Sequence, residues 1–387
     1  MWRFRYRGLR FDQIKECSLC GKKSKTVSEV IGVCVECLRN RPEEGLRIAL
    51  KAHGKSRGAF NLPLNVPRAE DGVKCNVCAN RCRIPEGGKG FCGLVVNKGG
   101  RLYRMAGGWR AVVSWYYDPL PTNCVAWWFC PGCTGRGYPT FSFSRRGAEK
   151  GYVNLAVFYG ACNSDCLFCQ NWSYRENTAL LKPIRTVAEL VNAAKNERVS
   201  CVCFFGGDPG PQIMHALMAS QKILEFSRRE KRIIRICWET NGLIGKPFLK
   251  RMIELSLTSG GIIKFDLKAW TPSVYKALTG VSNRSVYENF KTVAKYIGER
   301  PEVPLLTAST LLVPGYVDEY EVSKITEFIA SLDPEIPYSL LAFHPDYMLT
   351  DLPPTSRRHA LTAYNIAKKN GLKNVHIGNE WILGDYY

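Results

Sequence analysis

Three cysteines lie close together in the middle of the chain, in the pattern Cys162-x3-Cys166-x2-Cys169. Thiolates at this spacing can ligate three irons of a 4Fe-4S cluster and leave the fourth iron without a protein ligand. An electron carrier closes that corner with a fourth cysteine, so an open corner indicates chemistry at the metal, with a small molecule bound to the free iron. The alternatives for such a spacing are a zinc knuckle and a buried trio of cysteines.

Polar and glycine-rich motifs follow the three cysteines, and each comes directly after an apolar, β-rich run. The motifs are Gly206-Gly207-Asp208-Pro209, Glu239-Thr240-Asn241-Gly242, Lys264-Phe265-Asp266-Leu267-Lys268, Val313-Pro314-Gly315 and Phe343-His344-Pro345. Paired glycines let the backbone approach a ligand closely, and the charged side chains suit an amino-acid-like ligand. Together the motifs indicate one ligand site built from several strand ends.

The elements that position these motifs alternate regularly from residue 153 onward, which is typical of parallel β/α units. A barrel of this kind carries its chemistry on loops at the carboxyl ends of the strands. The predicted fold class is α/β, a partial (β/α)6 TIM-like barrel at 151–387 after small cysteine-rich metal-binding domains at 1–60 and 61–150. We predict strands at 153–158, 200–205, 233–238, 262–267, 306–312, 339–343 and 375–377, and helices at 213–227 and 319–331.

These motifs identify a resemblance: residues from about 153 to 380 resemble the radical S-adenosylmethionine (SAM) enzymes of the glycyl-radical-activase type. The region from Cys75 to Gly93, with residues 97–103 after it, is similar to the upstream part of the radical SAM component of the AmmeMemoRadiSam system. The resemblance implies a radical SAM barrel whose cluster, held by Cys162, Cys166 and Cys169, binds SAM at the open iron. An electron from a ferredoxin- or flavodoxin-type donor then releases a 5′-deoxyadenosyl radical.

The resemblance also implies roles for single residues around SAM, although Asp208 stands where the family more often has glutamate. Thr240 and Glu239 would bind a monovalent cation. The implied SAM contacts are Phe168 at the adenine, Gly206, Gly207 and Asp208 at the amino group, Asn241 in the motif at 239–242, Asp266 at the ribose hydroxyls, and Lys268 and His344 at the carboxylate or ribose.

Two C-x2-C pairs open the chain, Cys17/Cys20 and Cys34/Cys37, with thirteen residues between them. This pattern predicts a zinc ribbon, in which four thiolates form a tetrahedron and supply the folding free energy of a small unit. A rubredoxin-like iron is the alternative. A helix should begin near Pro42 and end at Gly54, with an apolar stripe of Leu46, Ile48, Ala49 and Ala52.

Two further cysteine sets follow the ribbon. Cys75, Cys78, Cys82 and Cys92 form a closed four-ligand site for zinc or a second 4Fe-4S cluster, with a structural or electron-relaying role. Cys124, Cys130 and Cys133 lie in an aromatic stretch and lack a fourth ligand. Their partner comes from elsewhere in the chain, or their site is open, or they share a metal with the second set. Strand packing is the favoured role of the aromatics, and base stacking the alternative.

Seventeen cysteines in 387 residues, fourteen of them in four tight sets, indicate metal ligands rather than disulfides, and therefore a reducing compartment. The remaining three, Cys201, Cys203 and Cys237, are expected to be core residues. The chain has no run of 18 apolar residues and no signal-peptide pattern at its start, so we expect a cytoplasmic protein with no membrane partner.

The net charge of +20 is concentrated in residues 1–150, which contain 27 Lys and Arg against 11 Asp and Glu. A cationic front end favours an anionic partner, and RNA is the first candidate. The leading hypothesis is a radical SAM enzyme that modifies a macromolecule such as RNA. The alternatives are an activase that installs a radical on a partner protein and a non-enzymatic metal-binding protein. The resemblance to the AmmeMemoRadiSam component also implies Memo-like and AMMECR-like proteins as partners.

Overall fold

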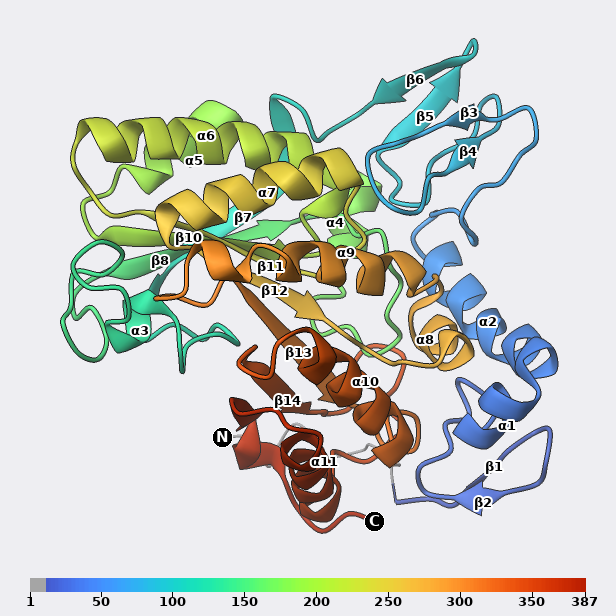
Figure 1. Cartoon of the computed structure of the whole chain (residues 1–387). Coiled ribbons are helices and arrows are strands. Elements are labelled where there is room, and N and C mark those ends of the chain that lie inside the picture. Colours follow the sequence, from blue (N-terminus) through green and yellow to red (C-terminus); the bar gives the residue numbers. More distant parts are fainter. Residues whose placement is uncertain (1–11) are drawn as a thin grey trace.

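The computed structural model describes residues 12–387, so residues 1–11, with four arginines of the basic front end, lie outside the described part. One nine-stranded sheet dominates the structure, in the order β15-β14-β13-β12-β11-β10-β8-β7-β9 (Figure 1). Its strands are β7 (Arg110–Pro119), β8 (Val153–Tyr159), β9 (Ile184–Thr186), β10 (Val199–Gly206), β11 (Arg235–Thr240), β12 (Ile263–Asp266), β13 (Leu306–Leu312), β14 (Tyr338–Ala342) and β15 (Val375–Gly378).

The strands from β8 to β15, apart from β9, are parallel and follow one another across the sheet in chain order. All seven predicted strands are present, with ends within two residues of the predicted ones. The predicted α/β fold with a partial parallel barrel is therefore confirmed. β15 extends the six-stranded unit by a seventh parallel strand at the open edge.

Two strands that the sequence did not predict complete the other edge. β7 runs antiparallel to β8, from Val113 opposite Tyr159 to Pro119 opposite Val153, and β9 pairs with the start of β7. The Tyr116 ring stacks on Phe158 with centroids 5.5 Å apart. Strand packing thus accounts for part of the aromatic stretch, and the sheet takes in a strand of the 61–150 segment.

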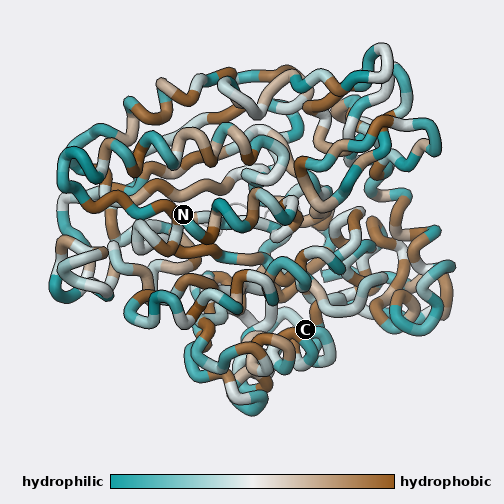
Figure 2. The backbone as a smooth tube through the Cα atoms, turned by 45° about the horizontal axis from the view of Figure 1, so that its top comes forward, coloured by the Kyte–Doolittle hydropathy of each residue, from teal (hydrophilic) through white to brown (hydrophobic). Residues whose placement is uncertain are grey.

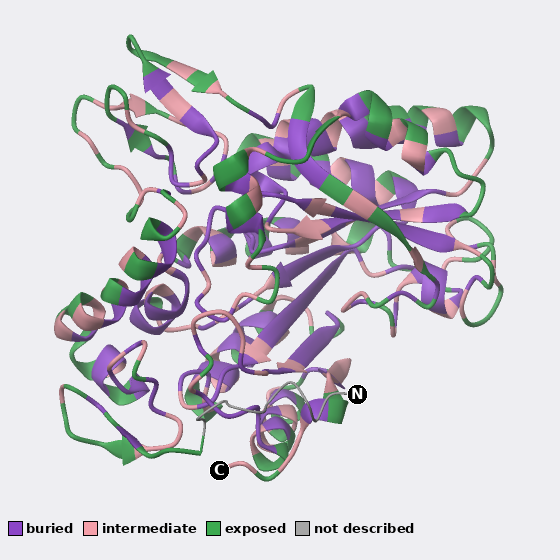
Figure 3. Cartoon of the chain, turned by 180° about the vertical axis from the view of Figure 1, so that it is seen from behind, coloured by how far each residue is buried: buried purple, intermediate pink, exposed green. Residues whose placement is uncertain are grey.

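Helices cover the outer face of the sheet (Figure 1). Hydrophobic segments run along the strands (Figure 2), and the buried residues concentrate there (Figure 3). Phe204 and Trp238 point outward, and the indole Nε1 of Trp238 donates to Ser256 Oγ at 3.0 Å. The predicted helices are confirmed with extensions of one or two residues. The helices are α4 (Tyr174–Leu180), α5 (Val187–Ala194), α6 (Ile213–Arg229), α7 (Lys246–Ser259), α8 (Pro272–Thr279), α9 (Arg284–Ala294), α10 (Glu319–Leu332) and α11 (Arg357–Lys369), with 3-10 turns η1 (Gly210–Gln212), η2 (Ile297–Glu299) and η3 (Glu380–Ile382).

Residues 120–152, which connect β7 to β8 and contain α3 (Pro131–Thr134), run across the inner face of the sheet; we refer to them as the plug loop. The indole Nε1 of Trp128 donates to Ser339 Oγ on β14 at 3.1 Å. At its other end, Glu149 accepts two hydrogen bonds from Arg235 on β11, at 2.8 and 2.7 Å. The plug loop is therefore fixed to both sides of the open barrel.

The first cysteine-rich unit comprises β1 (Lys15–Glu16), β2 (Lys23–Ser24), α1 (Val35–Asn40) and α2 (Pro42–Gly58). It packs on loops that follow β13 and β14. Arg39 pairs with Asp318 at 2.6 Å and with Glu321 at 2.8 Å. A Cβ on Gly315 would lie 2.1 Å from the carbonyl oxygen of Thr26, so only glycine permits this close approach.

The helix that begins at Pro42 continues to Gly58, so the predicted end at Gly54 is wrong. The last turn is held by tertiary contacts, because Ser56 and Arg57 are buried against the barrel. Tertiary contacts thus override the low helix propensity of glycine. Two hairpins, β3 (Val73–Lys74) with β4 (Arg83–Ile84) and β5 (Val95–Lys98) with β6 (Arg101–Arg104), carry the second cysteine set. Within residues 12–387, no helix has the length and apolar character that a membrane span requires.

The Glu149–Arg235 pair provides a test of how the plug loop is held. Burial alone would raise the pKa of Glu149, but the bonds from Arg235 and Ser200 hold it below its usual value. Glu149→Gln leaves the Arg235 guanidinium buried without a counter-charge, so the free energy of unfolding should fall by about 3–5 kcal/mol in chemical denaturation. The exposed pair Arg284–Glu288 is the control: Glu288→Gln should change this free energy by less than about 0.5 kcal/mol. Equal effects of the two substitutions would refute the assignment.

Candidate active site

The three cysteines follow β8 on the loop 160–173, which we call the cluster loop, and they form one wall of a cavity of about 230 Å³ at the carboxyl ends of the strands. The structure brings together all the predicted cluster and SAM residues except His344. The lining residues among those predicted are Cys162, Cys166, Phe168, Cys169, Gly206, Gly207, Asp208, Asn241, Asp266 and Lys268.

The spacing of the thiols distinguishes this site from a mononuclear one. A single metal ion needs ligand atoms that lie close together. Two groups of potential ligands in residues 12–387 have all their ligand atoms within 4.8 Å of one another, and the three cysteines of the cluster loop form neither of them. Its thiols are too widely spaced to share a single ion. They line a cavity together, which suits a cluster of several irons. Asn241 also donates its side-chain amide to Cys162 Sγ at 3.5 Å, a contact of the kind that tunes a cluster.

A buried carboxylate, Asp165, fixes the cluster loop. Its Oδ1 accepts hydrogen bonds from Arg175 Nη2 at 2.6 Å and from Ser56 Oγ at 3.0 Å, and its Oδ2 lies 2.9 Å from His53 Nδ1. The side chains of Asp165, His53 and Arg175 are at most 3% exposed. The loop is therefore bound to α2 and α4 through one side chain.

The second cysteine set lies beside the cluster loop. Asn80, between Cys78 and Cys82, donates its side-chain amide to the Asn163 carbonyl at 2.7 Å. Arg57 donates to the Phe91 carbonyl and lies over the Phe91 ring, with 3.6 Å from its Cζ to the ring centroid. Cys75, Cys78, Cys82 and Cys92 line a common cavity, and like the trio they are not grouped within 4.8 Å of one another.

The glycine pair approaches the cluster loop as the sequence predicted. A Cβ on Gly207 would lie 2.2 Å from the Ala161 carbonyl oxygen, so no larger residue fits. Both carboxylate oxygens of Asp208 accept hydrogen bonds from the protein. Oδ1 accepts from the Gly210 amide at 2.7 Å, and Oδ2 accepts from the Asn241 amide at 2.8 Å and from Thr240 Oγ1 at 3.0 Å. Burial raises the pKa of Asp208 to about 6, although these hydrogen bonds lower it.

A chain of alternating charges crosses the floor of the cavity. Lys264 Nζ lies 3.1 Å from Glu239 Oε2 and 2.6 Å from Asp266 Oδ1, and Lys268 Nζ lies 2.9 Å from Asp266 Oδ2. Burial opposes ionisation of Asp266, yet the two lysines hold its pKa well below the usual range. An ammonium of the chain itself therefore neutralises Glu239, the residue for which the resemblance implied a monovalent cation.

His344 follows β14 as predicted but does not line this cavity. Its Nδ1 lies 3.0 Å from the Pro345 carbonyl oxygen, and its Nε2 lies 3.8 Å from Asp346 Oδ2. Lys268 instead supplies the cation beside Phe168, with 5.7 Å from Nζ to the ring centroid.

The four ribbon cysteines form one of the two tight ligand groups of the described chain. Cys17 Sγ lies 3.7 Å from Cys37 Sγ, and Cys20 Sγ lies 3.6 Å from Cys34 Sγ. Zinc–sulfur bonds of about 2.3 Å in a tetrahedron place two sulfurs about 3.8 Å apart. The ribbon thus has the geometry of a mononuclear four-thiolate site.

Sequence reasoning assigned no role to two residues of the site, Lys264 and Asp165, for different reasons. Lys264 stands in the motif at 264–268, and its role could have been inferred because residues 264 and 266 alternate along β12 and so share a face. Asp165 gave no comparable signal: its partner His53 is 112 residues away, and only the folded chain brings the two together.

Asp165 makes stability depend on pH in a defined direction. Burial raises its pKa, but His53 and Arg175 outweigh burial and lower the pKa from 3.8 to about 2 in the folded chain. A depressed folded pKa contributes stability above pH 4 that is lost as the pH falls toward 2. The difference in free energy of unfolding between the wild type and Asp165→Asn should therefore shrink by about 2 kcal/mol from pH 6 to pH 2, measured by denaturation in parallel. A constant difference across this range would contradict the assignment.

Comparisons with known proteins agree with this geometry. A family model described as the Radical SAM superfamily matches residues 156–329. Uncharacterized protein MJ0808 of Methanocaldococcus jannaschii is 31% identical over 311 residues, which are 79% of this chain and 81% of that protein. An isethionate sulfite-lyase activating enzyme of Desulfovibrio desulfuricans is 29% identical over 141 residues, 36% of this chain and 40% of that enzyme.

Among solved structures, a domain of pyruvate-formate lyase-activating enzyme from Bacteroides vulgatus is 22% identical, with a TM-score of 0.36 over 46% of this chain and 98% of that one. Streptococcus suis SuiB bound to S-adenosylmethionine is 15% identical, with a TM-score of 0.43 over 59% of this chain and 52% of that one. On the family match and the activating enzymes among the relatives, this chain belongs to the radical SAM superfamily of enzymes.

Proposed function

We propose that the chain binds SAM in the cavity beside the cluster loop and cleaves it to a radical that modifies a macromolecular substrate. Membership of the superfamily implies a 4Fe-4S cluster and SAM. The observation that carries the proposal is the meeting of three cysteines, a glycine pair and the Asp266–Lys268 pair around one cavity. The bound cluster supplies the electron and the open iron site for SAM.

The residues of the chain have distinct parts in this proposal. Cys162, Cys166 and Cys169 hold the cluster. The backbone at Gly206 and Gly207 offers carbonyls to the SAM amino group, a role that its close approach to the cluster loop supports. Asp208 acts indirectly, because both of its oxygens already bind the Gly210 amide and the turn at 240–241.

Lys268 faces the SAM carboxylate, and Asp266, with both oxygens held by lysines, orients the floor of the cavity toward the ribose. Phe168 borders the adenine, next to the Lys268 ammonium. His344 approaches SAM in this proposal only if the loop after β14 moves, since it lies outside the cavity.

The accessory sites take different metals. The 3.6–3.7 Å sulfur spacing of Cys17, Cys20, Cys34 and Cys37 supports zinc in the ribbon. Cys75, Cys78, Cys82 and Cys92 surround a cavity at wider spacing, which supports a second 4Fe-4S cluster. Its neighbour Asn80 contacts the cluster loop, so this cluster is placed to relay electrons from a ferredoxin- or flavodoxin-type donor.

Substitution of one thiol tests the active-site cluster independently of the other metal sites. Cys166→Ser should abolish release of 5′-deoxyadenosine from SAM after anaerobic reconstitution, with a loss of about four irons per chain, because two thiolates cannot hold the cluster. Cys201→Ser, a matched substitution on β10, should retain both. The proposal fails if the Cys166→Ser protein cleaves SAM at the wild-type rate, or if the reconstituted wild type leaves SAM intact.

RNA is the macromolecule that the charge distribution favours. The exposed tip of the β5–β6 hairpin carries Lys98 and Arg101, and the following residues Tyr103 and Trp109 are 52% and 68% exposed. Exposed cations and exposed aromatic rings in one segment of the chain suit a single-stranded nucleic acid, through phosphate contacts and base stacking. The basic face of residues 12–150 would then deliver the substrate to the barrel.

The charge-reversal variant Lys98→Glu/Arg101→Glu tests this part. RNA affinity should fall, and the slope of log affinity against log salt should decrease by about 1–2, because two phosphate contacts are lost. Lys222→Glu on α6 is the control, an exposed lysine on the barrel that should leave the slope unchanged. If the wild type shows no salt-dependent RNA affinity, RNA is not the substrate. The proposal that the chain cleaves SAM does not depend on that result.

A protein substrate is the second candidate, and the activating enzymes among the relatives favour it. In this function the radical is placed on a glycine of a partner protein, with Memo-like and AMMECR-like proteins as candidates. Electron paramagnetic resonance of the reduced enzyme mixed with SAM and each candidate is the test. A protein-centred radical would identify the partner, and its absence with every candidate would exclude these proteins as recipients of the radical.

A further inference from the structure

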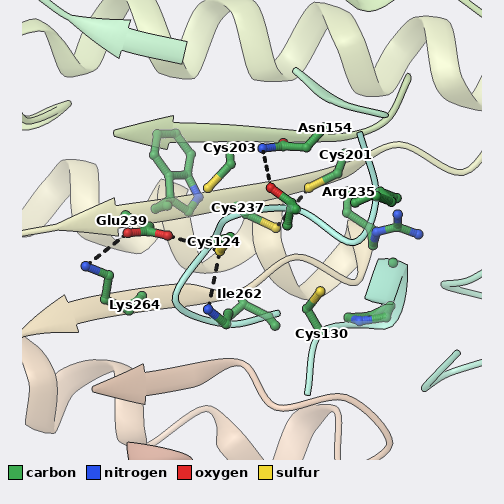
Figure 4. A pocket seen from close by; sticks show the side chains of 16 residues that line it. Cys124, Cys130, Asn154, Cys201, Cys203, Arg235, Cys237, Glu239, Ile262 and Lys264 are labelled. Atoms are coloured by element: carbon green, nitrogen blue, oxygen red, sulfur yellow. Dashed lines mark hydrogen bonds and ion pairs between the residues drawn. The ribbon is translucent and has the colours of Figure 1, made fainter. Parts of the chain in front are cut away.

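A second cavity lies below the proposed SAM site, between the plug loop and the inner face of β10, β11 and β12 (Figure 4). Five cysteines line it. Cys124 and Cys130 come from the plug loop, and Cys201, Cys203 and Cys237 come from the strands. Cys203 is buried as expected, and Cys201 and Cys237 are half-buried; the alternation of β10 and β11 turns all three to the inner face, where they also line this cavity. Cys133 does not line the cavity.

The sulfurs are not equivalent. Cys124, Cys203 and Glu239 form the second tight ligand group of the described chain, with their ligand atoms within 4.8 Å of one another. Cys124 Sγ lies 3.0 Å from Glu239 Oε1. Cys201 and Cys237 instead face each other, with 3.6 Å between their sulfurs. Three ligands from three separate segments of the chain thus converge on one point.

The size of the cavity limits what this point can hold. Its volume is about 30 Å³, in the measure in which one water needs about 10–15 Å³. An ion with one water fits this space, and the grouping of the three ligand atoms within 4.8 Å of one another suits a single ion rather than a cluster of several irons. Two thiolates and a carboxylate favour a thiophilic divalent ion such as Zn²⁺.

The surrounding charges accept such an ion without a net change. Glu239, Lys264, Asp266 and Lys268 already form a neutral set of two carboxylates and two ammonium groups. A dication together with the thiolates of Cys124 and Cys203 adds two positive and two negative charges, so the buried set stays neutral. A buried cluster of charges that remains neutral avoids the high cost of an unpaired ion.

Glu239 is oriented for this role. Its Oε2 is bound by Lys264, and its Oε1 points to Cys124, as the dashed lines in Figure 4 show. A partner that holds the second oxygen of a carboxylate ligand is typical of metal sites. Glu239 and Lys264 also line the SAM cavity, and so does Val125, the neighbour of Cys124. The site therefore lies directly beneath the reaction space.

We propose that Cys124, Cys203 and Glu239 bind one Zn²⁺-like ion between the plug loop and the barrel. Three protein ligands leave the fourth tetrahedral position for water or for a substrate atom, as in zinc sites that take part in catalysis. The ion fastens the start of the plug loop to β10 and β11 and forms the floor of the SAM cavity. This site goes beyond the proposed radical SAM function and does not depend on it.

Metal analysis of the full chain tests the proposal without any assay of SAM cleavage. The wild type, purified with zinc, should hold one zinc per chain more than Cys124→Ser, Cys203→Ser and Glu239→Gln. Cys237→Ser is the matched control, because Cys237 lines the same cavity on β11 but lies outside the ligand group, and it should keep the ion. Replacement by Co²⁺ should give a thiolate-to-cobalt absorption that decreases in Cys124→Ser and Cys203→Ser and not in Cys237→Ser.

Each outcome decides between defined alternatives. Unchanged zinc in both Cys124→Ser and Cys203→Ser overturns the site, and loss of the ion in Cys237→Ser overturns the three-ligand arrangement. Circular dichroism of each variant excludes loss of metal through unfolding, and Glu239→Gln, which keeps the shape of the side chain, decides the matter if a serine variant is unstable. The result is separable from the radical SAM function, because the iron content of the cluster loop is counted in the same samples.

Discussion

The structure depends on one buried carboxylate, that of Asp165. It lies between two cysteines of the cluster loop and binds Arg175 on α4 and both His53 and Ser56 on α2. A loop that offers three thiols to a cluster and leaves a corner open cannot rely on a fourth ligand for rigidity. Asp165 supplies that rigidity from the protein side, since a buried charge with fully engaged oxygens has a single favourable position. The positions of α2 and of the cluster loop are therefore fixed together, and the cysteine-rich N-terminal segment becomes part of the active-site scaffold.

The same principle extends to the other sites, because each cysteine set is joined to the barrel by buried polar contacts. Arg57, one turn beyond His53 on α2, contacts the residue before Cys92, and Asn80 contacts the cluster loop beside Cys162. Below the sheet ends, Glu149 and Arg235 hold the plug loop inside the open barrel. The metal-binding segments therefore surround one sheet, with the ribbon and the second set on the side of the strand ends and the plug loop across the inner face.

The sequence predicts much of this arrangement where the signal is local. Strands from 153 onward and the motifs at their ends follow from β-rich runs and turns, and the ribbon follows from the spacing of its cysteines. Contacts between distant segments were not predictable in the same way. Asp165 and His53 are 112 residues apart. The role of Cys203 depends on which face of β10 meets the plug loop. A parallel strand that is buried on both faces is apolar along its whole length, so its sequence does not show which residues face inward. β7 was not predicted because residues 110–119 lie outside the regular alternation of strands and helices that begins at residue 153.

Lys264 links the two cavities and explains why the barrel tolerates so many buried charges. Its ammonium lies between Glu239 and Asp266, so it serves a carboxylate of the lower cavity and one of the upper cavity at once. A diffusible cation at this position would exchange with solvent, whereas a lysine on β12 has a fixed place and a fixed charge. Any change of charge in one cavity therefore acts on the other through a single nitrogen, at a distance of about 3 Å from each carboxylate. An ion held by Glu239 below would draw negative charge away from Lys264, and the ammonium would then interact more strongly with Asp266, on the floor where SAM is proposed to lie.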